Sequence, residues 1–220
     1  MDTKENGSPN VYDVIAESWY RLRRHTRFSA ELTELAARWR GGRLLNVGCA
    51  HGPDFLPFAG KFDLWGLDSS TAMIRLASQH SGKFKFTASL LVADAISLPF
   101  QDKSFDYIIS VAAHHHILDK QGRLQAFREL RRVLKPGGEV FLTVWNRWQK
   151  DFIGKGEQAI VPWKIKNQKL LRHYYLFTYP GITGLLKSAG FEVMRTYPES
   201  NYRFPLKYFS RNICVLARPD

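Results

Sequence analysis

Small residues interrupt an apolar run in the stretch LLNVGCAHGPDFLPF, residues 44–58. Residues 44–47 are typical of a buried strand, because continuous apolar runs suit parallel sheets that are covered on both faces. The small residues that follow are Gly48, Cys49, Ala50 and Gly52. Such a turn lets the backbone approach a ligand and leaves N–H groups free to contact it. An ordinary strand-to-helix loop gives the same pattern, so the turn needs support from elsewhere.

Two aspartates supply that support, since each ends a predicted strand. Asp68 ends the strand expected over 62–68, and Asp94 ends the strand expected over 88–94. The carboxyl ends of parallel strands meet at one sheet edge, where open α/β sheets bind ligands. There Asp68 can accept hydrogen bonds from both ribose hydroxyls, and Asp94 can reach the exocyclic amine of adenine. Either aspartate alone is also typical of a helix cap or a turn. Together with the turn they predict a nucleoside site.

The elements that must position these residues alternate between strands and helices, which predicts an α/β fold with a doubly wound, mostly parallel sheet. Two helices are expected within 11–40. The remaining expected elements are strands over 43–47, 62–68, 88–94, 104–113 and 139–145, helices from Asp54 or Phe55, over 69–80 and within 114–134, a turn at KPGG (135–138), a helix and a strand within 181–198, and a last strand over 211–219. We expect disorder over 1–10 and a single domain over 11–220, with 151–180 as an aromatic and basic insertion over the site.

The bulk composition favours an intracellular enzyme with a polyanionic partner. The net charge is +12 and the sequence pI is about 9.8. Such a balance suits nucleic acid, although a solvated basic surface would also produce it. Two cysteines are too few for a disulfide framework or a cysteine zinc site. The polar start lacks the character of a secretory signal, and no run approaches a membrane span. We therefore expect a cytoplasmic protein.

Residues 40–145 resemble the class I methyltransferases that use S-adenosylmethionine. LLNVGCAHG is similar to their glycine-rich motif, and ADAISLPFQDKSFDYIIS to their adenine-binding and fourth-strand motifs. RELRRVLKPGGEVFLTVW is similar to their following helix, turn and fifth strand. The resemblance implies a Rossmann-like fold, S-adenosylmethionine as cofactor and S-adenosylhomocysteine as product. The cofactor contacts it implies are Tyr12, Gly48, Cys49, Ala50, Gly52, Asp68, Ser69, Asp94, Ala95, Ser110 and Val111.

A narrower resemblance covers most of the chain. NVYDVIAESWYRLR, ISVAAHHHI, VWNRWQ, VPWKI and RHYYLF are similar in order and spacing to segments of the tRNA wobble-uridine methyltransferases. Those enzymes esterify the carboxylate of 5-carboxymethyluridine in the anticodon loop. The chain departs from their pattern in having a third histidine, His114, in having Ala50 in place of a common glycine, and in the details of RHYYLF.

The narrower resemblance also implies catalytic residues. Arg23 aligns with an N-terminal arginine that would position the carboxylate or a phosphate, although a solvent-facing role fits it equally. His115 and His116 align with a histidine pair, and we expect His115 to face the substrate, with a structural hydrogen bond as the alternative for either. Three adjacent histidines cannot share a helix face and have no acidic or cysteine partner at ligand spacing, so no metal site is expected.

Aromatic and basic residues near the end of the fifth strand and in the tail are candidates for the acceptor site. Trp145 could stack on a uracil or could close the core. The tail segment that includes Arg172 and Tyr174 mixes bases with aromatics, as single-stranded RNA sites do, although an aromatic cover over the sheet is the competing interpretation. We expect Trp145, Arg172 and Tyr174 to bind the substrate.

The resemblance further implies a small zinc-binding activator protein that adds a strand beside the strand near 87–94. TASLLVAD is apolar up to its final aspartate and would lie at the sheet edge, where an exposed strand is a template for strand addition. The leading hypothesis is a tRNA wobble-uridine methyltransferase. A methyltransferase for a quinone precursor or a carboxylic acid is the first alternative, and a non-catalytic RNA-binding subunit is the second.

Overall fold

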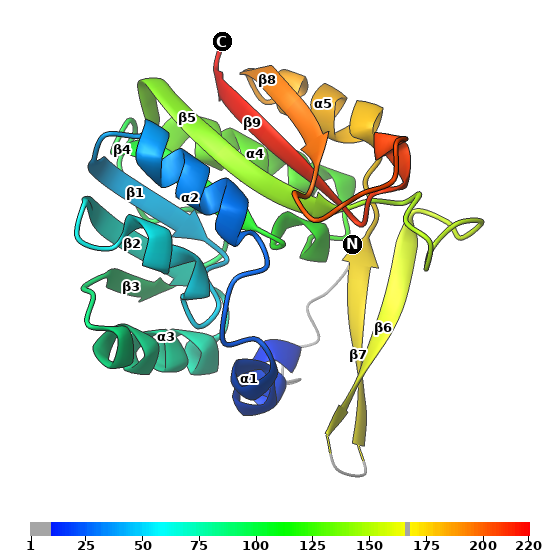
Figure 1. Cartoon of the computed structure of the whole chain (residues 1–220), viewed down its shortest axis with the longest axis horizontal. Helices are drawn as coiled ribbons and strands as arrows, with labels where there is room; N and C mark the ends of the chain where they lie inside the picture. Colours follow the sequence, from blue (N-terminus) through cyan, green and yellow to red (C-terminus); the bar gives the residue numbers. More distant parts are fainter. Residues whose placement is uncertain (1–9, 166–167) are drawn as a thin grey trace.

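A seven-stranded sheet forms the centre of the computed structural model, which describes residues 10–165 and 168–220 (Figure 1). The strand order is β3-β2-β1-β4-β5-β9-β8. The strands are β1 (Gly42–Val47), β2 (Phe62–Asp68), β3 (Ser89–Val92), β4 (Phe105–Val111), β5 (Leu134–Trp145), β8 (Phe191–Pro198) and β9 (Asn212–Pro219). The first five are parallel, and β9 runs antiparallel to both β5 and β8. The expected mostly parallel α/β sheet is therefore confirmed.

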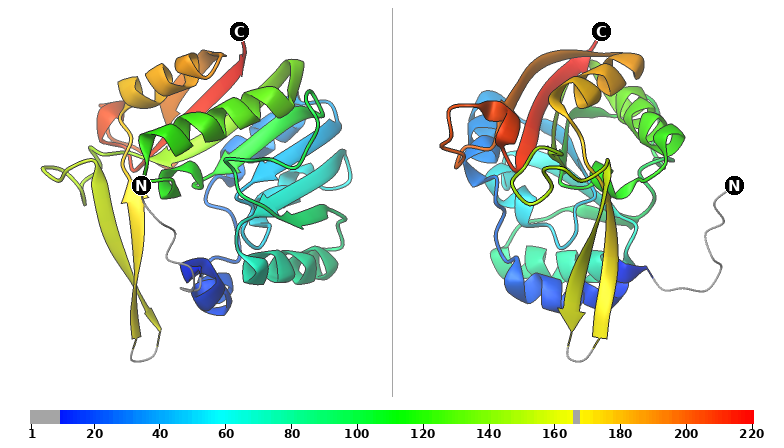
Figure 2. Two further views of the ribbon diagram at one scale, coloured as in Figure 1. Left: turned by 180° about the vertical axis from the view of Figure 1, so that it is seen from behind. Right: turned by 90° about the vertical axis from the view of Figure 1, so that its right-hand side faces the viewer.

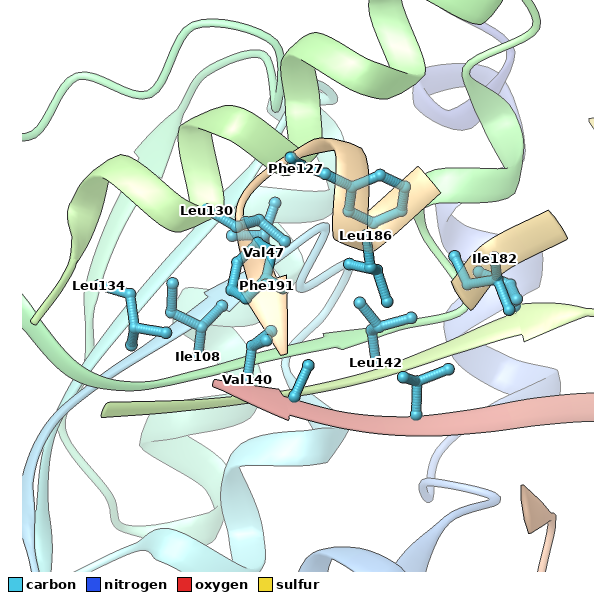
Figure 3. Close-up of a cluster of buried hydrophobic side chains, with 14 of the residues drawn as sticks. Val47, Ile108, Phe127, Leu130, Leu134, Val140, Leu142, Ile182, Leu186 and Phe191 are labelled. Carbon is cyan, nitrogen blue, oxygen red and sulfur yellow. The ribbon is translucent and has the colours of Figure 1, made fainter. Parts of the chain in front are cut away.

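Helices cover both faces of this sheet. On one face lie α4 (Lys120–Val133) and α5 (Tyr179–Ser188), and on the other lie α2 (Ser29–Arg38) and the 3₁₀ helix η1 (Pro53–Phe58). Figure 3 shows Phe127 and Leu130 of α4 above Val140 and Leu142 of β5. These side chains are buried on both sides of the contact, so the α4 face anchors the long β5 strand.

The remaining helices lie beyond the β3 edge. The N-terminal end of α3 (Thr71–Phe84) follows β2 directly, and α1 (Val11–Leu22) packs on α3 through Ala16, Met73 and Leu76. The α1 helix therefore stands outside the sheet, next to the carboxyl ends of its strands (Figure 1). This position makes the N-terminal helix a wall of whatever binds at that edge.

Three expected elements differ from those in the structure. The helix expected from Asp54 or Phe55 is the short 3₁₀ helix η1, because Pro57 lacks the N–H that a continuing α-helix needs. The KPGG turn is absorbed into β5, where the pairing with β4 shifts register and Gly137 has φ +78°. The strand expected over 88–94 is limited to β3, and Asp94 lies two residues beyond its end.

The segment 151–180, expected as an aromatic and basic insertion with no clear period, contains a β-hairpin. Its strands are β6 (Gln158–Ile165) and β7 (Gln168–Tyr175), which pair antiparallel and form their own two-stranded sheet. Burial alternates along β7, with Arg172 and Tyr174 inside and His173 outside. Because aromatic and aliphatic residues occupy both faces of the hairpin, the sequence does not show the alternation of apolar and polar residues that usually reveals a strand. The expected disorder over 1–10 lies almost wholly outside the described residues.

The β3 strand lies at the open edge of the sheet, as expected for the apolar strand near 87–94. Its pairing with β2 runs from Ser89 to Val92, and Val92 remains 51% exposed. An exposed apolar residue on an edge strand is a site where another chain can pair. In the described residues, no helix combines the length and apolar character that a bilayer crossing requires.

Candidate active site

The glycine turn and the Asp68 carboxylate are joined directly at the carboxyl edge of the sheet. Asp68 Oδ2 accepts a hydrogen bond from the Ala50 N–H at 2.9 Å, and Oδ1 accepts one from the Ser70 N–H at 3.0 Å. Gly48 has φ +73°, and a Cβ there would lie 2.3 Å from the Ala113 Cβ, so no larger residue fits. Burial raises the pKa of Asp68, and the two N–H donors oppose that shift.

A cavity of about 480 Å³ opens at this edge. Its walls come from the ends of β1, β2 and β4, the loop after β3, the helix α1 and the hairpin. Eight of the eleven expected cofactor contacts line it: Tyr12, Gly48, Ala50, Asp68, Ser69, Asp94, Ala95 and Val111. Acceptor oxygens on two carboxylates beside a turn of small residues suit a ligand with a sugar, a base and a charged tail.

The other three expected contacts, Cys49, Gly52 and Ser110, do not line the cavity. The Cys49 side chain is 1% exposed and packs against Gly66 of β2. Gly52 supplies a positive φ of 78° at the start of η1. Ser110 donates to the Val47 carbonyl at 3.0 Å and contacts His114 Nδ1 at 2.8 Å. Ser110 lies on β4, where the pleat turns alternate residues toward the core, whereas Cys49 and Gly52 belong to the turn that follows β1.

The asparagine and aspartate at the start of α1 tie this helix to the cavity. Asp13 Oδ1 accepts hydrogen bonds from the Ser70 hydroxyl at 2.6 Å and from the Ala72 N–H at 2.9 Å, which caps the first turn of α3. Asn10 Nδ2 donates to the Ser69 hydroxyl at 3.3 Å. Because Tyr12 lies between these two anchors, its ring is held over the cavity.

The three adjacent histidines form the 3₁₀ helix η2 (His114–His116) on the wall after β4. The Tyr12 hydroxyl lies 3.0 Å from His116 Nε2, and the Trp145 N–H donates to His115 Nδ1 at 3.3 Å. The His114 ring stacks on Phe127 with centroids 4.7 Å apart. All three line the cavity, but His114 is held by packing and by Ser110.

Burial keeps these histidines neutral. It lowers the pKa of His114 and of His116 to about 4. The pKa of His115 is also lowered, first by burial and then by the two neighbouring histidines. A neutral imidazole positions a partner by hydrogen bonding but carries no charge near pH 7. The site therefore suits an acceptor that is already ionised.

Trp145 and Tyr174 form the aromatic wall of the cavity. Their rings stack with centroids 4.2 Å apart and planes inclined by 6°, and the His115 ring lies 5.2 Å from each. Tyr174 is 1% exposed, and Phe152 packs against the ring of Trp145 from the following loop. This stack joins the hairpin to β5, so Trp145 takes part in packing as well as lining the cavity.

Arginines gather at the same cavity. Arg23, which was expected there, lines it together with Arg27 and Arg211, which were not. The pKa of Arg23 is lowered by burial and then by Arg27, Arg211 and Arg172. Among the described residues, no acidic side chain forms an ion pair with any of the four. Uncompensated cations at a partly desolvated surface favour an anionic ligand.

Arg172 lies behind the cavity wall and does not line it. Its guanidinium carbon is 4.8 Å from the centre of the Trp163 ring and 5.6 Å from that of Trp19, and the residue is 6% exposed. Its Nε has no hydrogen-bond partner. Trp163 in turn donates to the Ser18 hydroxyl at 2.8 Å, so the hairpin packs against α1 (Figure 2).

Residues 45–142 match the family model described as a methyltransferase domain. A protein from Encephalitozoon cuniculi named "Putative methyltransferase" is 30% identical over 158 residues, which cover 69% of this chain and 70% of that protein. The chain belongs to the methyltransferase family.

Other relatives of this methyltransferase chain carry more specific names. The human "Probable tRNA methyltransferase 9B" is 27% identical over 212 residues, covering 96% of this chain and 41% of that protein. The Arabidopsis thaliana "tRNA (carboxymethyluridine(34)-5-O)-methyltransferase" is 35% identical over 143 residues, covering 64% of this chain and 33% of that protein. The chain thus spans only about a third to two fifths of the length of several curated relatives that it matches.

Solved structures share the fold at low identity. An S-adenosylmethionine-dependent methyltransferase from Clostridium acetobutylicum superposes with a TM-score of 0.75 at 15% identity, covering 96% of this chain and 99% of that one. A chain from the structure titled "Complex between the Haloferax volcanii Trm112 methyltransferase activator and the putative methyltransferase" gives a TM-score of 0.67 at 18% identity, covering 97% of this chain and 99% of that one.

Sequence reasoning about the methyltransferase site missed Arg27 and Arg211. The basic run 21–27 and the basic tail were visible as clusters, but the sequence does not show which arginine faces the cavity. Arg27 follows α1 in the connection to α2, and Arg211 immediately precedes β9. Their meeting depends on β9 inserting beside β5, which is a long-range pairing that no local pattern reveals.

A buried histidine pair behind the glycine turn predicts a loss of stability in acid. The rings of His51 and His80 lie 5.4 Å apart, and the Tyr20 ring packs edge-on against both. Burial, followed by Lys83 and His25, lowers the pKa of His80 to about 4 from an ordinary value of 6.5. Between pH 4 and pH 6.5 the unfolded chain therefore binds more protons than the folded chain. The contribution of His80 to the free energy of unfolding is fully present above pH 6.5 and is lost as the pH falls toward 4.

We expect His80→Leu to reduce the decrease in the free energy of unfolding that acid causes. The wild-type free energy of unfolding should fall on the order of 2 kcal/mol more than that of the variant between pH 7 and pH 4.5. Urea unfolding at each pH measures the difference, with His173→Leu on the exposed face of β7 as the control. Asp54, whose pKa burial raises to about 6, acts in the opposite sense in both proteins and cancels in the comparison. Parallel pH profiles for wild type and His80→Leu would contradict the prediction.

Proposed function

We propose that this chain is an S-adenosylmethionine-dependent methyltransferase that esterifies the carboxylate of a 5-carboxymethyl wobble uridine in tRNA, in the cytoplasm. The main support for a carboxylate as methyl acceptor is that Arg23, Arg27 and Arg211 line the same cavity, whose histidines are neutral. The names of the relatives support the same substrate class.

We place the cofactor-binding site at the carboxyl edge of the sheet. Asp68, held by two backbone N–H groups, presents its remaining lone pairs to the ribose hydroxyls. Asp94 stands at the adenine end, and the backbone around Gly48 faces the charged tail. Tyr12, on α1, covers this cofactor-binding site. When bound, S-adenosylmethionine supplies a methyl group on a positively charged sulfur, which makes that methyl electrophilic.

The acceptor chemistry needs little from the protein except position. A carboxylic acid with a pKa near 4 is ionised at neutral pH, so no general base is required. A carboxylate oxygen forms the new bond to the methyl carbon as the carbon–sulfur bond breaks, and the sulfur keeps the electron pair as a neutral thioether. The arginines hold the carboxylate in line, and the wall of Trp145, Tyr174 and His115 excludes water.

Methyl transfer to tRNA tests the proposal directly. We expect label from methyl-labelled S-adenosylmethionine to enter tRNA that carries 5-carboxymethyluridine, and to be released by mild alkali because a methyl ester hydrolyses there. A tRNA with unmodified uridine at the same position is the control. Transfer to free carboxylic acids with none to tRNA would instead establish the small-molecule alternative, which the aromatic enclosure of the cavity also suits.

An activator subunit is part of the proposal. The open β3 edge and the exposed Val92 offer a place where a small zinc-binding protein could add a strand. One structural neighbour comes from a complex with the Trm112 methyltransferase activator. Co-elution of the two chains after co-expression, and its loss when Val92 is replaced by lysine, would support this pairing.

A further inference from the structure

The connection between β8 and β9 exposes a dense group of large apolar side chains. The exposed fractions are 56% for Phe204, 55% for Leu206, 52% for Tyr208 and 42% for Phe209. We call residues 199–211 the β8–β9 loop. Single exposed apolar residues are ordinary, but a contiguous group of this kind marks an interaction surface.

This loop is held in one conformation by buried polar groups. The Glu199 carboxylate accepts hydrogen bonds from the Arg211 N–H at 3.2 Å and the Asn212 N–H at 2.7 Å, which closes the base of the loop. Asn146, at the end of β5, donates to the carbonyls of Tyr208 at 2.7 Å and Ser210 at 2.8 Å. The exposed aromatics therefore stand on a fixed support, which lowers the entropic cost of binding through them.

Within the loop, cations alternate with the aromatics. Arg203, Lys207 and Arg211 are its basic residues, and its single acid, Glu199, is buried and accepts backbone N–H groups. Lys207 lies 5.2 Å from the centre of the Tyr179 ring and 5.8 Å from that of Tyr208. Aromatic faces interleaved with uncompensated cations are the composition of sites for single-stranded nucleic acid. Cations without acidic neighbours also suit the negatively charged phosphates of such a strand.

The loop is continuous with the cavity. Arg211, the last residue of the loop, lines the cavity, and so does Asn212, the first residue of β9. Figure 1 places the loop and the β6–β7 hairpin on the same side of the molecule, beyond the carboxyl ends of the central strands. A nucleotide that enters the cavity therefore brings its neighbours in the strand toward this loop.

We propose that the β8–β9 loop binds the unpaired nucleotides that flank the target nucleotide. Phe204, Tyr208 and Phe209 stack on bases, and Arg203 and Lys207 contact phosphates. This inference rests on the proposed function, since it assumes an RNA acceptor. It adds a second contact outside the methyl-transfer cavity, which fixes the position of the anticodon loop and not the chemistry.

Binding to an anticodon stem–loop RNA tests the inference. We expect the double variant Phe204→Ala/Phe209→Ala to weaken the dissociation constant about 10-fold or more, because stacking on two bases is lost. Met194→Ala is the control, since Met194 on β8 is 42% exposed, the same fraction as Phe209. The affinity for S-adenosylhomocysteine should be unchanged in both variants, which also verifies that the fold is intact.

A second RNA separates base stacking from charge. In a stem–loop whose flanking loop nucleotides are abasic, the wild-type protein should bind at least as weakly as the double variant binds the intact RNA, because the stacking of Tyr208 is lost as well. Equal binding of intact RNA by wild type and double variant would overturn the inference, and a simultaneous change in oligomeric mass would assign the loop to a protein contact. Wild-type methylation of a small carboxylic acid without any RNA binding would overturn the proposed function instead.

Discussion

Replacement of Asp68 by asparagine is expected to weaken S-adenosylhomocysteine binding by about 100-fold or more. The carboxylate accepts hydrogen bonds from the N–H groups of Ala50 and Ser70, and in the proposed cofactor site it also accepts hydrogen bonds from the ribose hydroxyls. Asparagine keeps one acceptor oxygen and turns an NH₂ group toward a donor. Loss of two hydrogen bonds to a charged group at about 1.5–3 kcal/mol each corresponds to at least this factor. Isothermal titration calorimetry measures the affinity.

Asp63→Asn is the matched control for this experiment. Asp63 lies on the same strand, β2, but its side chain is 56% exposed and bonds to Arg43 and Trp65 at the surface. We expect its affinity for S-adenosylhomocysteine to remain within about 3-fold of wild type, since surface ion pairs contribute little. An Asp68→Asn protein that binds as tightly as Asp63→Asn would remove the ribose role from Asp68.

Replacement of Arg23 by alanine is expected to lower kcat/KM for the carboxylate acceptor by about 100-fold or more, the usual scale for removing a donor aimed at the reacting oxygens. Arg23→Lys should recover little of this, because the planar fork that can hold both oxygens is lost. The affinity for the cofactor should stay unchanged. Initial rates over a range of tRNA concentrations separate kcat from KM.

Stability gives this second experiment an independent readout. Since burial, followed by Arg27, Arg211 and Arg172, lowers the pKa of Arg23, its charged form is disfavoured in the folded state. Its removal should leave the melting temperature unchanged or raise it, as expected for a residue kept for function. Arg24→Ala, at an exposed position next in the chain, is the control. A similar loss of activity in both variants would show a general effect of surface charge and would count against the positioning role.

The elements whose limits are set by residues close in the chain could be predicted from the sequence. The strand expected over 62–68 is found at those residues, because a buried run flanked by glycine and helix-capping serines has clear limits. The KPGG segment could not be placed, because its inclusion in β5 depends on a register shift against β4. The hairpin was missed for a similar reason, since its strands pair only with each other and carry apolar residues on both faces.

The candidate site divides in the same way. Asp68 and Gly48 could be placed together because the end of a parallel strand fixes where its last residue lies. The Arg211 side chain reaches the cavity only because β9 returns beside β5, and that pairing is set by the whole sheet. Cys49 and Ser110 were expected at the ligand from their positions in motifs, but Cys49 packs against Gly66 and the pleat of β4 turns Ser110 into the core.

Different segments of the sequence supply the different walls of the cavity, and this has a consequence for engineering. The block that matches the family, 45–142, contains Gly48, Asp68 and Asp94, whereas the aromatic and cationic walls come from the flanks on either side of it. In the proposed function, most residues assigned to the cofactor therefore lie in the central block and most of those assigned to the acceptor lie in the flanks, with Tyr12 and His115 as the exceptions. Chimeras that exchange the two flanks together, while leaving the central block in place, offer a route to redirecting such an enzyme toward another acceptor.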